Sequence, residues 1–119
     1  MIEPVFTFLV VAEDGTSHEQ HYRVGAADPV DDIVRGLVGG WLEPIRVADP
    51  TLALYCDEDG RLRGRTVNPV GSRLAFLLGG PAAVYVGPIV VTGHRRHTTV
   101  SLTEQQIDHL LAALAACRR

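Results

Sequence analysis

The sequence predicts one α+β domain in which three helices pack on a mostly antiparallel sheet. Several short apolar or alternating segments, which are typical of strands, are separated by turn-forming Asp, Gly and Pro residues. Three other segments carry apolar residues at helical spacing and begin at capping residues. The chain has 119 residues, of which 46% are apolar, so we expect residues 1–119 to form a single domain with its own core.

The first strands form a predicted hairpin. Residues 5–11 are apolar on both alternating faces, which is typical of a central strand covered on two sides. A turn signal follows at residues 13–16, and residues 18–24 then alternate, with Tyr22 and Val24 on the face turned toward the core.

Residues 30–44 contain the longest predicted feature of the central sequence, a helix with Asp28 as its cap and Pro29 at its first position. Its apolar stripe is Ile33, Val34, Leu37, Val38, Trp41 and Leu42. Gly39 and Gly40 interrupt this stripe, and each costs about 1 kcal/mol against alanine inside a helix. Either the helix packs closely on the sheet at the glycines, or it ends there and the pair is a hinge. The continuing stripe favours close packing, with Trp41 in the core or at an interface and Pro44 ending the helix.

The middle of the chain predicts two more short strands and a hairpin. Residues 45–47 and 51–56 are strand-like, and the acidic turn at 57–60 leads into a returning strand at 61–66. On such a strand Arg61, Arg63 and Arg65 would project from one face. Asn68 then caps a short helix at 69–78, whose predicted inward residues are Val70, Leu74, Leu77 and Leu78.

The last third predicts strands followed by a C-terminal helix. Residues 83–86 and 89–92 are strand-like and are joined by a Gly-Pro kink, and a polar loop at 93–97 leads to a short strand at 98–100. Thr103 and Gln106 match a capping box, so we expect a helix over 104–116. Its predicted inward face is Ile107, Leu110, Leu111 and Leu114.

The net charge of −3 conceals a strong asymmetry between the two halves. Residues 1–59 hold 12 acids and 3 arginines, whereas residues 60–119 hold 2 acids and 8 arginines, and the chain has no lysine. The halves either neutralise each other within the fold or leave an acidic and a basic face. The second arrangement would favour self-association or an anionic ligand.

Five segments together resemble one protein family. They are Leu37-Val-Gly-Gly-Trp-Leu-Glu43, Leu54-Tyr-Cys-Asp-Glu-Asp-Gly-Arg-Leu62, Asn68, Val86-Gly-Pro-Ile-Val-Val-Thr-Gly93 and Ser101-Leu-Thr-Glu-Gln-Gln-Ile107. In this order they are similar to the domain of unknown function 3846, over nearly the whole chain. The resemblance implies a small cytoplasmic protein of bacteria, phages or mobile elements, and it implies no activity. The chain departs from the family in its arginine-rich segment before Asn68 and its basic loop at 94–97.

The best candidate for chemistry is an anion site. Three arginines on one strand face, followed by the free N–H groups of a capped helix, would suit a phosphate or carboxylate such as that of a nucleotide. The candidate ligand-binding residues are Arg61, Arg63, Arg65, Asn68, Ser72 and Arg73. The alternative is a solvated basic strand beside an ordinary asparagine cap.

A second alternative is an enzyme that uses Cys56 as a nucleophile, but no family signature surrounds this residue. Both Cys56 and Cys117 are expected to be reduced thiols. We therefore name no catalytic residue and lean against an enzyme.

We predict no metal and no cofactor. His18 and His21 fall on opposite faces of a strand, and His94 and His97 lack a third ligand. Nucleic acid is a disfavoured partner because the pI is 5.9 and aromatic residues are only 6%.

No apolar run approaches the roughly 18 residues of a membrane span. The first six residues contain no basic leader, so we expect a cytoplasmic protein without a membrane partner. By elimination, the predicted function is a non-enzymatic interaction module that binds a protein partner or forms a homodimer.

Overall fold

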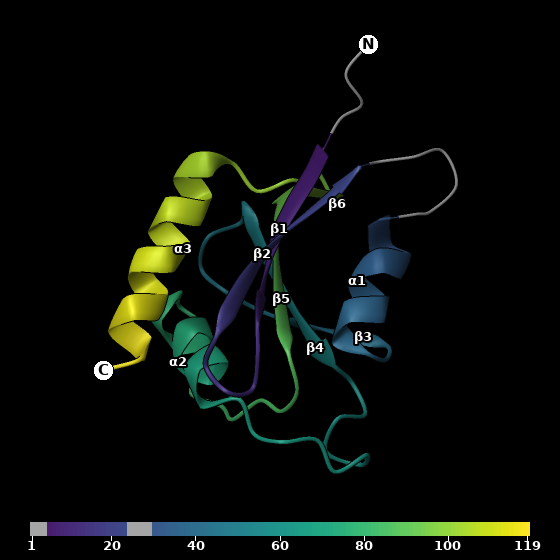
Figure 1. Ribbon diagram of the computed structural model, residues 1–119, viewed down its shortest axis with the longest axis vertical. Coiled ribbons are helices and arrows are strands. Elements are labelled where there is room, and N and C mark those ends of the chain that lie inside the picture. Colours follow the sequence, from purple (N-terminus) through teal and green to yellow (C-terminus); the bar gives the residue numbers. More distant parts are fainter. Residues whose placement is uncertain (1–4, 24–29) are drawn as a thin grey trace.

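An antiparallel sheet lies between helices on its two faces, with α1 on one face and α2 and α3 on the other (Figure 1). This computed structural model describes residues 5–23 and 30–119. The strands are β1 (Val5–Val11), β2 (Ser17–Arg23), β3 (Leu42–Ile45), β4 (Leu52–Asp57), β5 (Ile89–Arg95) and β6 (Thr98–Val100). The helices are α1 (Val30–Val38), α2 (Pro69–Leu77) and α3 (Glu104–Cys117). The predicted α+β class is confirmed.

The strand order is β2-β1-β5-β4-β3, and β6 pairs with the far end of β5. Every pairing of these strands is antiparallel, and the predicted hairpin of β1 and β2 is confirmed. β5 is the centre of the sheet, because it pairs with β1, β4 and β6. Among the described residues, no helix combines the length and apolarity that a bilayer crossing requires.

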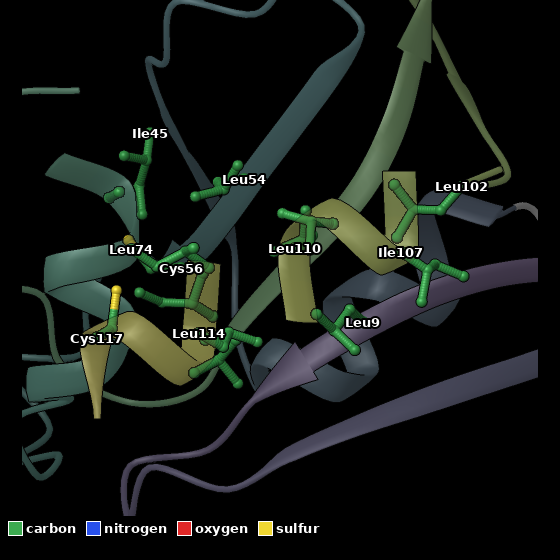
Figure 2. Close-up of a cluster of buried hydrophobic side chains, with 14 residues drawn as sticks. Leu9, Ile45, Leu54, Cys56, Leu74, Leu102, Ile107, Leu110, Leu114 and Cys117 are labelled. Carbon is green, nitrogen blue, oxygen red and sulfur yellow. The ribbon is translucent and has the colours of Figure 1, made fainter. Parts of the chain in front are cut away.

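Two apolar cores explain why β1 is apolar on both faces. Leu9 and Val11 belong to the larger core, which they share with residues of α2 and α3. Figure 2 shows Leu9 within this core. Phe6, Phe8 and Val10 point the other way and pack against α1. A strand whose side chains alternate between two covered faces is mostly apolar, and in β1 only Thr7 is polar.

Asn68 caps α2 as predicted, and it also ties three segments together. Its Oδ1 accepts a hydrogen bond from Gly71 N at 2.8 Å, while its Nδ2 donates to Val11 O and Gly87 O, both at 2.9 Å. Its own backbone N donates to Tyr85 O at 2.9 Å. The side chain is fully buried, so these bonds form without competition from water.

The C-terminal helix begins as predicted, at a capping box in which Thr103 and Gln106 exchange hydrogen bonds. Ile107, Leu110 and Leu114 are buried against the sheet and α2 (Figure 2). Leu111 is 41% exposed, so its predicted inward position is wrong.

The predicted continuation of the first helix through Gly39 and Gly40 is also wrong. α1 ends at Val38, and Gly39 takes a φ of +85°, which is the usual glycine conformation just beyond a helix. The chain then enters β3, which pairs with β4 over residues 42–45 in place of the predicted strand at 45–47. Trp41 is 63% exposed and not part of the core. Val24, Asp28 and Pro29, which the predictions also used, lie outside the described residues.

Three further segments differ from prediction. Residues 61–66 are not a strand, because their backbone closes local turns, such as Arg63 N to Asp59 O at 3.0 Å and Arg65 N to Gly60 O at 2.9 Å. Residues 83–86 make only an isolated bridge between Val67 and Val86, since the N–H and C=O of Tyr85 bond to Ser72 and Asn68.

The predicted polar loop at 93–97 is instead the end of β5 and a tight turn through Arg96 and His97, at φ values of 51° and 64°. In α2, the predicted inward position of Leu77 is wrong, because this residue is 56% exposed.

We expect Asn68→Ala to lower the free energy of unfolding by about 3 kcal/mol, because it leaves several buried backbone groups without partners. Urea denaturation followed by circular dichroism measures this change. Thr103→Ala removes an exposed cap and should cost only about 1 kcal/mol, which makes it the matched control. Equal losses in the two variants would contradict the central role of Asn68.

Candidate functional site

The six residues of the predicted anion site do not form one cluster in the structure. Arg63 and Arg65 converge on Asp57, whereas Arg61 bonds to the carbonyl of Val84. The premise of one strand face is therefore wrong, because this segment is a series of turns.

The other three residues of that site serve the fold. Asn68 and Ser72 hydrogen-bond to each other and to the segment around Tyr85. Arg73 Nη1 donates to Cys117 O at 3.0 Å, at the end of α3. Whether any of the six residues binds an anion stays a prediction.

Asp57 is the centre of a charged cluster that the sequence reading missed. Its side chain is fully buried at the end of β4. Arg65 Nε lies 2.9 Å from its Oδ2, Arg63 Nη2 bonds to the same oxygen, and Asp59 N donates to its Oδ1 at 3.0 Å. A buried carboxylate requires such partners, because an unpaired charge in the interior is strongly destabilising.

The glycine pair after α1 makes room for this cluster. Gly39 O accepts a hydrogen bond from Arg63 Nη2 at 2.8 Å. A Cβ on Gly39 would collide with the Arg65 guanidinium, and a Cβ on Gly40 would collide with that of Arg63 and lie 2.5 Å from Asp57 Oδ1. The glycines therefore allow the close approach of two arginines and of the Asp57 carboxylate at the end of β4.

Trp41 lies beside the same cluster on the surface. The guanidinium of Arg35 is 4.9 Å from the centroid of its ring, and Arg35 also pairs with Asp32. The exposed indole is thus covered on one side by a cation, which stabilises both groups by a cation–π contact.

Cys56 lacks the environment of a nucleophile. Cys56 is 3% exposed, and its Sγ–H donates to Glu43 Oε2 at 3.7 Å. Burial, followed by the negative charge of Glu43, raises the pKa of Cys56 from 9.0 to about 12. Burial also raises the pKa of Cys117. In the described part of the chain, no three His, Cys, Asp or Glu side chains come together as a metal site would need.

An apolar groove lies between α2, the segment at 81–86 and the end of α3. It encloses about 560 Å³. We call it the α2–α3 groove, and its lining residues are Val67, Pro69, Ser72, Arg73, Phe76, Leu77, Ala82, Ala83, Val84, Ala116 and Cys117. Four of its apolar side chains are strongly exposed: Phe76 at 61%, Leu77 at 56%, Val84 at 51% and Val67 at 45%.

Sequence reading missed this groove because it assigned Leu77 to the core and residues 83–86 to the sheet. One feature of the sequence could have indicated the groove. α2 has apolar residues on more than one side, with Leu74 buried and Phe76 and Leu77 exposed, whereas a helix that buries one face needs apolar residues on that face only.

A family model described as Domain of unknown function (DUF3846) matches residues 7–115. The chain belongs to this family. Searches of curated proteins and of solved structures each found no match. In this DUF3846 domain, two segments that carried the sequence resemblance, at 37–43 and 54–62, meet at the Asp57 cluster.

In this DUF3846 domain, we expect Gly40→Ala to lower the free energy of unfolding by about 1–3 kcal/mol, because the added methyl group displaces Arg63 and presses on buried Asp57. Gly36→Ala is the matched control, since a Cβ there meets nothing within 4 Å and should stabilise α1 by roughly 0.5–1 kcal/mol. Thermal unfolding of both variants measures the difference. A neutral Gly40→Ala would show that the close approach is dispensable.

We expect native Cys56 to react with iodoacetamide about a thousandfold more slowly at pH 8 than in the unfolded chain, because its raised pKa leaves few thiolates. Mass spectrometry of the Cys56 peptide gives the rate. The raised pKa also means that the neutral thiol stabilises the fold below about pH 9, and that this contribution declines as the pH rises toward 12. Fast alkylation of the folded protein near neutral pH would contradict both expectations.

Proposed function

We propose that this domain is a non-enzymatic binding module that holds a protein partner in the α2–α3 groove. The observation that carries the proposal is the grouping of four exposed apolar side chains around one groove, Phe76, Leu77, Val84 and Val67. Contiguous exposed apolar surface is a common mark of an interaction site, whereas single exposed apolar residues are not.

The rest of the fold supports this choice of face. Apolar side chains of β1, β4 and β5 are buried in the two cores under α1, α2 and α3. The groove differs from these cores in that its apolar side chains are exposed, because α2 is only nine residues long and Phe76 does not face the sheet. Phe76 is an aromatic side chain of the kind that often dominates binding energy at interfaces.

The openness of the groove favours a peptide or protein over a small molecule. Small-ligand sites commonly bury about 70–90% of the ligand surface. Here Phe76 and Leu77 are more than half exposed, so the groove covers one side of an occupant. The free thiols Cys56 and Cys117 fit a reducing compartment, and we keep the cytoplasm as the proposed location. A phage or mobile-element origin stays a prediction.

The proposal is tested by selecting displayed random peptides on the purified domain. We expect binders whose affinity falls at least about tenfold in Phe76→Ser, because truncating an aromatic anchor commonly costs more than 1.4 kcal/mol. Fluorescence anisotropy measures the dissociation constants. Leu62→Ser is the matched control, since Leu62 is 88% exposed and does not line the groove. Binders that tolerate Phe76→Ser but not Leu62→Ser would place the interaction elsewhere.

A further inference from the structure

The α2–α3 groove has a one-sided charge. Of its lining residues only Arg73 is charged, and no acidic residue occurs anywhere between residues 61 and 103. Arg61 adds a second cation at the groove wall, because its guanidinium bonds to the carbonyl of Val84. Acids of α3 are far away, since Asp108 and Cys117 lie nine residues apart, or about 14 Å along a helix.

We propose that the occupant of the groove is an amphipathic helix of another protein, with acidic residues along one border of its apolar face. This inference rests on the proposed function. Apolar residues at helical spacing would contact Phe76, Leu77 and Val84, and a flanking carboxylate would pair with Arg73. Guanidinium groups suit this role, because they bind carboxylates through two parallel N–H donors.

Arg73 is held in place for such a contact. Its Nη1 donates to Cys117 O, which fixes the side chain between α2 and the end of α3, where the two helices pack (Figure 1). No carboxylate of the described residues forms an ion pair with Arg73. By contrast, Arg63 and Arg65 are already neutralised by Asp57.

The walls of the groove favour a helix over an added strand. Strand addition needs an exposed sheet edge with unpaired backbone groups. The groove is instead walled by side chains of α2, by the end of α3 and by residues 82–84. Residues 82–84 belong to no strand of the described sheet, and their segment makes an isolated bridge, Val67–Val86, to the residue before Asn68. Surfaces of this kind bind helices through apolar anchors one turn apart.

The same charges disfavour a second copy of the chain. A two-fold symmetric contact would bring groove against groove and Arg73 near its symmetry mate, with no acid of the groove to separate them. Acids of this chain are concentrated in residues 1–59, which hold 12 of the 14. A contact between that half of one copy and the groove of the next would be head-to-tail, which forms rings or filaments and not a closed dimer.

The test selects displayed peptides of about 15 residues, or four helical turns, with Leu at helical spacing and random flanking positions. We expect the wild-type domain to enrich Asp and Glu at one flank, and R73E to enrich Lys and Arg there instead. For the best binder, we expect Arg73→Gln to weaken binding about three- to tenfold in fluorescence anisotropy, and the wild-type affinity to fall as salt is raised. R95E is the matched control, because it makes the same charge change at the exposed end of β5 and should leave selection unchanged.

The outcomes separate this inference from the proposed function. Phe76-dependent binders without acidic flanks, or with basic ones, would overturn the inference and leave the groove as a binding site. Absence of any Phe76-dependent binder would overturn both. Self-association that Phe76→Ser abolishes in sedimentation would replace the proposed partner with a second copy. Tight binding of a fluorescent fatty acid, with no peptide enriched, would replace it with a lipid.

Discussion

A carboxylate buried at the end of a strand determines how the middle of this domain folds. Asp57 is the last residue of β4, and its side chain has no exposure to water. An isolated charge in that position would be too costly to keep, so the chain must bring cations to it. Residues 58–65 therefore fold back through turns and place Arg63 and Arg65 on the carboxylate. Those guanidinium groups pack against the glycine pair after α1, and Arg63 donates a hydrogen bond to Gly39 O.

This arrangement leaves the two faces of the sheet with different properties. On one face α1 closes over Phe6, Phe8 and Val10, and the core there is covered. On the other face α3 buries the sheet, while the short α2 leaves Phe76 and Leu77 outside. Because the acids are concentrated in the first half of the chain, the groove that results is apolar and basic. Its shape and charge, and not a set of reactive groups, are what support a binding function.

The sequence correctly predicts the elements that are determined by residues close together in the chain. The caps at Asn68 and Thr103 were found because their hydrogen bonds are made within one helical turn. The sequence predicts that β1 is covered on both faces, because all of its side chains except Thr7 are apolar. The anion site failed as a geometric unit for the opposite reason. Alternation alone predicts a strand for its arginines, whereas the position of Arg63 is set by its ion pair with Asp57, six residues away in the sequence.

The sequence by itself determined the α+β class, the family, the hairpin of β1 and β2 and the starts of α2 and α3, since periodicity and capping are local properties. Tertiary structure alone decided where α1 ends and where the arginines lie. An apolar stripe through Trp41 predicts a helix equally well whether or not the chain turns at Gly39. What ended the helix was the pairing of residues 42–45 with β4 and the approach of Arg63 from a distant segment. The sequence likewise does not predict the α2–α3 groove, because its walls come from three segments that meet only after folding.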